Sequence, residues 1–171
     1  MLEDFLGSKV SVKILSLIIE NPKSEFYEKE IQKKLKVARG SVIKWLHIFE
    51  NKGLIFKTQR GKLNIYRLNS ENPIVRQLKI LNTVSKLLPY FEMLKNEAEI
   101  YLYGSASRGE DIEDSDIDIL VIGKNREVIE KIKSADKKIK VSFFTPLEWA
   151  KIAKEDPTFY DRVEKDKIRL L

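Results

Sequence analysis

Apolar residues in the first part of the chain follow helical spacing and then strand spacing. Val10, Ile14, Leu17 and Ile18 recur at intervals of three and four residues, which predicts a helix that stops before Asn21-Pro22. A second helix is expected to begin at Ser24 or Glu25, and its apolar positions are Tyr27, Ile31 and Leu35. A third is expected from about Arg39 to Lys52, ended by Gly53. Residues 54–68 then predict two strands around a turn at Arg60-Gly61.

A polar, proline-terminated linker, Asn69 to Pro73, closes this first part. The next apolar residues predict a helix of about four turns that Pro89 interrupts, followed by a shorter one around Phe91 and Leu94. The helical positions are Ile74, Leu78, Leu81, Val84, Leu87 and Leu88. Such a helix could pair two chains or cover a sheet of the last part, and the second interpretation is favoured.

The last part of the chain alternates between strands and helices. The expected strands are Glu99–Tyr103, Asp116–Ile122, Lys138–Phe144 and a short one within Lys167–Leu171. The expected helices are Arg126–Ala135 and Pro146–Lys154, the latter with proline in its first turn. This order predicts a small mixed sheet with helices packed against it.

Composition limits the chemistry that the chain can carry. Its 171 residues, 43% hydrophobic and 34% charged, suffice for one large or two small domains. The absence of cysteine excludes disulfides and thiolate metal sites, and a single histidine, His47, excludes a histidine-clustered zinc site. The apolar run Ile14 to Ile19 is too short to span a bilayer, so no membrane association and a cytoplasmic location are expected.

Positive charge is concentrated in the first part. Residues 1–73 hold 14 Lys and Arg against 8 Asp and Glu, whereas residues 74–171 hold 18 of each, which accounts for the net charge of +6. A basic first part and a neutral second part indicate two domains with different partners.

Candidate chemistry is concentrated in residues 101–122. An apolar strand reaches Gly104-Ser105, a polar loop follows, and a second apolar strand opens with Asp116 and Asp118. Side chains two apart on a strand point the same way, about 6.6 Å apart along the backbone. Two carboxylates on one face beside a small-residue turn suit a Mg²⁺–nucleotide site, with oxygen ligands for the ion and backbone N–H groups for phosphate. The alternative to a binding site is a surface loop that happens to be acidic.

Gly104-Ser105, Arg108-Gly109 and Asp116-Ile117-Asp118 at this spacing resemble the signature of the minimal nucleotidyltransferases of the DNA polymerase β-like superfamily. The resemblance covers roughly residues 98–171. It implies transfer of a nucleoside monophosphate from an NTP, with ATP the expected one, to an acceptor hydroxyl. Gly104 and Ser105 would then hold the triphosphate, and Asp116 and Asp118 would be catalytic ligands of Mg²⁺. Arg108 would hold a phosphate, or pair with Glu110, Asp111, Glu113 or Asp114.

One position departs from the family pattern. Active members carry a third carboxylate on the neighbouring strand, where it serves as metal ligand and general base. Alternation along the expected strand 138–144 turns Ile139, Val141 and Phe143 toward the core, and places Lys140 where the third acid should stand. An ammonium there would pair with the aspartates, compete with Mg²⁺ and fail to accept a proton. The sequence therefore predicts a recognisable nucleotide site with incomplete catalytic machinery.

Three helices followed by a basic hairpin resemble a winged helix-turn-helix domain. The resemblance implies that the third helix enters the major groove of double-stranded DNA while the hairpin contacts phosphates. Val42, Leu46 and Phe49 are expected to face inward. The expected DNA-binding residues are Arg39, Ser41, Lys44, His47, Arg60 and Lys62. The alternatives are that these charges only solvate a surface, or that the domain pairs two chains; His47 by itself is better explained as a surface polar residue.

The expected fold class is α+β, with a winged helix-turn-helix domain over residues 1–72, connecting helices over 73–97 and a nucleotidyltransferase-like domain over 98–171. The first functional hypothesis is a nucleotidyltransferase, in the manner of small enzymes of toxin–antitoxin pairs that adenylylate a partner protein. The second is a transcriptional regulator whose degenerate transferase domain senses nucleotide or binds a protein partner. A homodimer is compatible with either.

Overall fold

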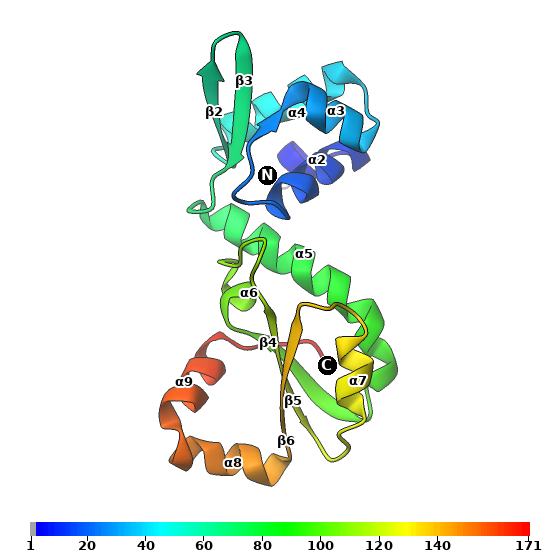
Figure 1. Ribbon diagram of the computed structural model, residues 1–171, viewed down its shortest axis with the longest axis vertical. Coiled ribbons are helices and arrows are strands. Elements are labelled where there is room, and N and C mark those ends of the chain that lie inside the picture. Colours follow the sequence, from blue (N-terminus) through cyan, green and yellow to red (C-terminus); the bar gives the residue numbers. More distant parts are fainter. Residues whose placement is uncertain (1–2) are drawn as a thin grey trace. The chain divides into compact units, whose positions relative to one another are not determined.

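The structure is a computed structural model that describes residues 3–171. The chain forms two compact units, the first ending at Leu78 and the second running from Lys79 to Leu171 (Figure 1). Each unit has a hydrophobic core of its own. The two units are therefore described separately.

The first unit begins with helices. They are α1 (Glu3–Leu6), α2 (Lys9–Ile19), α3 (Glu28–Leu35) and α4 (Arg39–Asn51). A capping box formed by Ser8 and Ser11 starts α2. The side chains of Ile14, Ile18 and Phe49 are fully buried in one core, as the helical spacing predicted.

A small antiparallel sheet completes this unit. Strands β2 (Ile55–Arg60) and β3 (Leu63–Leu68) form a hairpin whose turn contains Gly61 at φ +63°. A two-residue strand, β1 (Phe26–Tyr27), pairs with β3 and gives the order β1-β3-β2. The predicted start of the second helix at Ser24 or Glu25 was therefore wrong. Phe26 and Tyr27 pair with β3 instead, and the helix begins at Glu28.

Helix α5 (Pro73–Phe91) is continuous, so the predicted interruption at Pro89 is also wrong. Pro89 lacks the N–H that would bond to the carbonyl of Ser85 in the preceding turn, and its ring crowds that carbonyl. The buried side chains of Leu87 and Phe91 pack into the core of the second unit and hold this turn in place. A 3₁₀ turn, η1 (Glu92–Leu94), follows.

The second unit is built on a four-stranded mixed sheet. Its strands are β4 (Ala98–Tyr103), β5 (Ile117–Gly123), β6 (Ile139–Phe144) and β7 (Ile168–Arg169), in the order β6-β5-β4-β7. Strand β5 pairs antiparallel with β4 and parallel with β6. Helix α7 (Val128–Lys133) lies in the crossover between β5 and β6. These strands agree with the predicted mixed sheet to within about two residues at each end.

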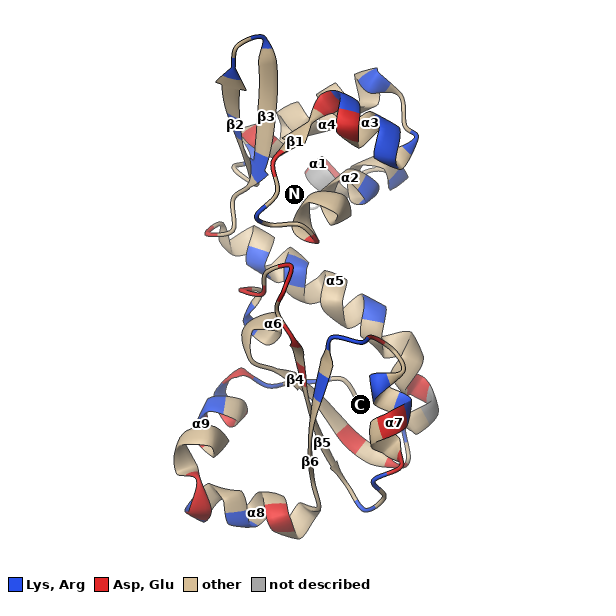
Figure 2. Cartoon of the chain, in the orientation of Figure 1, with Lys and Arg blue, Asp and Glu red and all other residues tan. Residues whose placement is uncertain are grey.

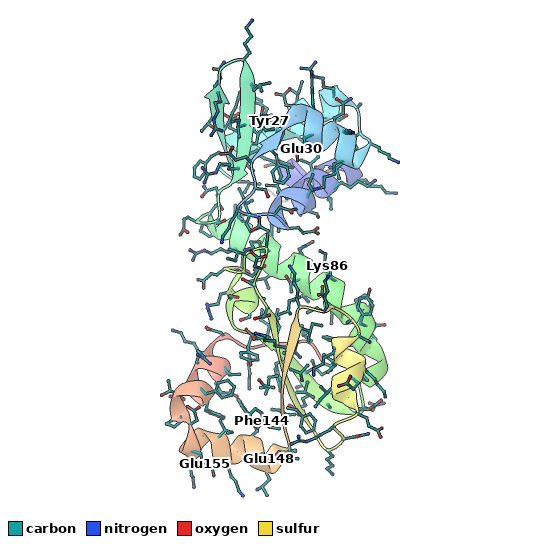
Figure 3. The ribbon with its side chains drawn as sticks, in the orientation of Figure 1. Tyr27, Glu30, Lys86, Phe144, Glu148 and Glu155 are labelled. Carbon is teal, nitrogen blue, oxygen red and sulfur yellow. The ribbon has the colours of Figure 1, made fainter. Side chains whose placement is uncertain are left out.

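Because side chains alternate along each strand, the two faces of the sheet contribute to two different cores. Ile100, Leu102, Ile119 and Val121 pack with Leu87 and Phe91 of α5 and with Val128 and Ile132 of α7. On the opposite face Tyr101, Tyr103 and Leu120 pack beneath α8 (Pro146–Glu155) and α9 (Pro157–Asp166). Phe144 of β6 points toward these two helices (Figure 3), 5.4 Å from the ring centroid of Trp149 and 6.3 Å from that of Phe159.

Two helices of the second unit were absent from the sequence prediction. Helix α9 begins at the N-cap Asp156, whose carboxylate accepts a hydrogen bond from the backbone N–H of Phe159 at 3.0 Å. The one-turn helix α6 (Ser105–Arg108) follows Gly104 directly. Both helices border the candidate site. None of the described helices is long and apolar enough to cross a membrane.

Candidate active site of the second unit

The two aspartates stand where β5 begins. Asp116 precedes the strand and Asp118 is its second residue, so both lie at the same end of the sheet. In the strand register Asp118 is opposite Tyr103 of β4 and Lys140 of β6. The face that carries these residues also carries α8 and α9. The site therefore lies at one end of the sheet, on the face that these helices cover.

Gly104 brings the backbone against Asp118. It follows β4 with φ +77°, a conformation that only glycine adopts readily. A Cβ atom at this position would lie 2.5 Å from Oδ2 of Asp118, so no side chain fits between the turn and the carboxylate. The hydroxyl of Ser107 donates to the carbonyl of Gly104 at 2.8 Å and fixes the turn. The Gly104-Ser105 turn and Asp118 therefore form one contiguous surface.

Lys140 occupies the place that strand alternation predicted for it. Its Nζ atom lies 2.6 Å from Oδ2 of Asp116, with both side chains substantially exposed. The hydrogen bond to Asp116 raises the pKa of the Lys140 ammonium, and the charges of Asp116 and Asp118 act in the same direction. The lysine therefore stays charged at neutral pH beside the two carboxylates.

Asp118 is half-buried, and burial raises the pKa of its carboxyl group above the ordinary value. The negative charge of Asp116 raises this pKa further, whereas the positive charges of Lys140 and Arg162 lower it. A nearby cation would stabilise the ionised forms of these two neighbouring carboxylates. The arrangement therefore suits a positively charged ligand.

A divalent ion would find few protein ligands at this site. Among residues 3–171, no group of three or more His, Cys, Asp or Glu side chains is arranged to hold a metal. Asp116 and Asp118 supply two carboxylates, and Mg²⁺ commonly binds proteins through one or two carboxylates together with substrate phosphates. The residues therefore fit an ion that arrives with a phosphorylated ligand, and fit an isolated ion poorly.

Comparison with known proteins identifies the family of the second unit. A profile described as nucleotidyltransferase domain matches residues 80–170. The chain belongs to this nucleotidyltransferase family. Among solved structures, a candidate nucleotidyltransferase from Sulfolobus solfataricus is similar over 55% of this chain and 84% of its own, with 22% identity and a TM-score of 0.36. No curated protein matched the chain.

Membership of the nucleotidyltransferase family implies a nucleotide substrate, and such domains generally use a divalent metal. Gly104, Ser105, Asp116 and Asp118 come together at one end of the sheet. Arg108 is on α6, with its Nε atom 2.7 Å from Glu110 and its Nη1 atom 2.6 Å from Asp166 of α9. These two hydrogen bonds raise the pKa of the Arg108 guanidinium. The sequence prediction included Glu110 among the partners and missed Asp166.

Sequence reasoning missed several residues around the nucleotidyltransferase motif. The Tyr103 hydroxyl and the Ser142 hydroxyl lie 2.9 Å apart on the face that carries Asp118. Strand alternation gave a signal for Ser142, because it places Ser142 on the same side as Lys140. Arg162 lies on α9, which the sequence prediction did not include.

The loop between α6 and β5 is acidic (red in Figure 2), and lysines hold it in place. The side chain of Lys79 on α5 is only 2% exposed, and its Nζ atom lies 3.3 Å from Oδ1 of Asp111. It also donates to the backbone carbonyl of Asp111. Lys138 donates to the carbonyl of Glu113. The loop that leads to Asp116 is therefore tied to α5 and to the residue that precedes β6, which no sequence pattern indicated.

The candidate DNA-binding residues are on the outside of the first unit. On α4 the side chains of Arg39, Lys44 and His47 are exposed and Ser41 is partly exposed, opposite the buried Val42, Leu46 and Phe49. Arg60 and Lys62 are exposed at the β2–β3 turn, where Figure 2 shows a basic tip. Carboxylates lie close to three of them, since Arg39 is 3.7 Å from Glu28, Arg60 is 3.5 Å from Glu25 and His47 is 4.0 Å from Glu50.

Proposed function

We propose that the second unit binds an NTP together with Mg²⁺ and transfers its nucleoside monophosphate to an acceptor hydroxyl. The observation that carries this proposal is the contact between the Gly104 turn and the Asp118 carboxylate, which would place a phosphate and an Asp-bound ion next to each other. ATP is the expected nucleotide.

Each residue of the motif has a proposed role. The N–H and hydroxyl groups of Ser105 hold phosphate oxygens, which the absence of a side chain at Gly104 leaves accessible. Asp116 and Asp118 hold the ion, which would neutralise charge on the reacting phosphate and on the leaving pyrophosphate. Arg108 now donates both of its hydrogen bonds to carboxylates, those of Glu110 and Asp166. Once it releases Asp166, it donates a further hydrogen bond to a phosphate.

Lys140 favours a second candidate function. Its ammonium stands beside Asp116 at 2.6 Å, and a charged lysine can neither coordinate the ion nor take a proton from an acceptor hydroxyl. The alternative is a regulator whose nucleotide site senses NTP or docks a protein partner without rapid transfer. The enzyme and an NTP-sensing regulator share nucleotide binding and differ in turnover, whereas a regulator that docks a protein partner needs no nucleotide.

We also propose that the first unit is a winged helix-turn-helix domain that binds double-stranded DNA. Support comes from the exposed basic side chains on α4, which follows α3 after a short turn, and from the basic tip of the β2–β3 hairpin. Helix α4 would enter the major groove, while Arg60 and Lys62 would contact phosphates.

Calorimetric titration of the full chain with each of the four NTPs, with and without Mg²⁺, tests the nucleotide proposal. Saturable binding that requires Mg²⁺ is expected, with ATP preferred. If no NTP binds in the presence of Mg²⁺, the proposed nucleotide function is wrong for the enzyme and for the NTP-sensing regulator. Pyrophosphate release from the bound NTP then separates the enzyme from the regulator.

A further inference from the structure

Helix α9 carries an arginine toward the candidate site. Phe159 and Val163 of this helix pack into the aromatic core that covers the Asp118 face of the sheet. The guanidinium of Arg162 lies over the ring of Phe159, 5.5 Å from its centroid. That ring in turn meets the ring of Tyr103 edge-on, with centroids 6.2 Å apart, and Tyr103 is opposite Asp118 in the strand register.

The charge of Arg162 is available for a ligand. Its side chain is exposed, and within the described part of the chain no carboxylate forms an ion pair with it. Arg108, by contrast, is bonded to both Glu110 and Asp166. Burial raises the pKa of both Asp118 and Tyr103, and the positive charge of Arg162 opposes that rise in each. Stacking on Phe159 limits the conformations of the side chain and leaves its N–H groups free.

We propose that Arg162 binds a phosphate group of the nucleotide held at Gly104, Ser105 and Asp118. A guanidinium presents paired N–H donors that match two phosphate oxygens, and it keeps its charge at every physiological pH. Arg108 is held in ion pairs with Glu110 and Asp166, whereas Arg162 provides a cation that is free to bind phosphate. This inference rests on the proposed nucleotide binding and adds a residue from outside the sequence motif.

The chain offers a matched control for this role. Arg126 also stacks on a phenylalanine, with its guanidinium 5.4 Å from the ring centroid of Phe143. Phe143 packs with the core on the opposite face from Asp118. Arg126→Ala therefore removes the same kind of contact and the same charge, away from the proposed phosphate.

The experiment is a calorimetric titration of the full-length parent, Arg162→Ala, Arg162→Lys and Arg126→Ala proteins with MgATP. Arg162→Ala is expected to weaken binding roughly 10- to 100-fold, as for loss of a charge-assisted hydrogen bond. Arg162→Lys should restore part of the affinity, and Arg126→Ala should match the parent. Thermal unfolding of each variant checks that the fold is retained.

The possible outcomes separate the two proposals. If the parent binds MgATP and Arg162→Ala binds equally well, the phosphate role of Arg162 is wrong while nucleotide binding stands. If Arg126→Ala weakens binding as much as Arg162→Ala, the effect is one of general charge and the specific role is again wrong. If the parent itself does not bind MgATP, the proposed function fails and the role of Arg162 fails with it.

Discussion

The ammonium of Lys140 lies 2.6 Å from a carboxylate oxygen of Asp116, at the strand position where active nucleotidyltransferases are expected to carry an acid. The pair is exposed, so its contribution to stability is small. Its importance is chemical, because one of two candidate metal ligands already has a cationic partner. A metal–nucleotide complex must displace that partner in order to bind.

Replacing this lysine by an acid should favour turnover. Lys140→Asp would remove the competing cation and supply a carboxylate beside Asp116 and Asp118. General-base catalysis typically contributes about 10²–10⁴-fold, so an imperfectly placed carboxylate should still give measurable transfer. The measurement is Mg²⁺-dependent pyrophosphate release from ATP with a candidate acceptor. Lys140→Ala, which removes the ion pair without adding a base, is the control and should stay slow. Rapid release by the parent protein would contradict the view that the site is catalytically degenerate.

Nucleotide binding should depend on both aspartates. Each single change, Asp116→Asn or Asp118→Asn, is expected to weaken binding of MgATP, because a charged ligand of the ion is lost. The double variant should show no Mg²⁺-dependent binding in a calorimetric titration. Asp136→Asn, at an exposed position beyond α7, is the control and should bind as the parent does. A double variant with parental affinity would rule out a metal site at these residues.

DNA binding by the first unit should be steeply salt-dependent. A domain that meets about five phosphates should give a log–log slope near −4.5, from about −0.9 for each contact. Changing Arg60 and Lys62 to Ala should make that slope shallower by about two units on all duplexes, as measured by fluorescence anisotropy. Changes at Arg39 or Lys44 should instead alter sequence preference.

A control for this test lies in the second unit. Lys133 and Lys137 are exposed there, and changing both to Ala removes the same charge from the chain. The slope should then keep its parental value. If the parent protein binds no duplex even at low salt, the DNA-binding proposal is wrong.

Alkaline pH should destabilise each unit through tyrosines whose pKa is raised in the fold, among them Tyr66 in the first unit and Tyr101 in the second. Burial, together with Glu28, raises the pKa of Tyr66 to about 12, and burial with a hydrogen bond to Glu99 raises that of Tyr101 to about 12. The folded chain thus holds these protons more tightly than the unfolded chain, where the pKa is about 10. Their stabilising contribution is complete below pH 10 and is lost as the pH rises toward 12.

Urea unfolding between pH 9 and 11 measures this effect. The free energy of unfolding of the parent should fall more steeply with pH than that of a Tyr66→Phe, Tyr101→Phe double variant. Equal slopes for the two proteins would show that neither tyrosine is responsible.

The sequence could predict where the motif residues lie because they are local. Gly104 directly follows β4, Asp116 directly precedes β5 and Asp118 lies within β5, and the two strands are neighbours. Alternation along β6 was enough to predict that Lys140 stands beside the acids, which the ion pair with Asp116 confirms. Helix α9 was missed because Pro157 follows closely on the end of α8 and interrupts the pattern, and because Val163 is the one residue of α9 that is fully buried. Arg162 and Asp166 were lost with it.

Other features depend on contacts that one chain segment cannot reveal. Lys79 is almost fully buried because it meets Asp111, which is 32 residues away in sequence. Lysine is rarely buried, so a prediction from the sequence of α5 alone would expose the side chain of Lys79 to solvent. The continuity of α5 through Pro89 likewise depends on the packing of Leu87 and Phe91 in the core of the second unit.

The contact between Gly104 and Asp118 also links the histories of these two positions. An alanine at 104 would bring its methyl group to 2.5 Å from the aspartate oxygen, in a backbone conformation that alanine resists. Loss of Asp118 would remove that contact but not the positive φ, so a side chain at 104 needs both a smaller residue at 118 and a changed turn. In relatives that have drifted away from nucleotide chemistry, a side chain at the position of Gly104 should therefore accompany a smaller residue at the position of Asp118.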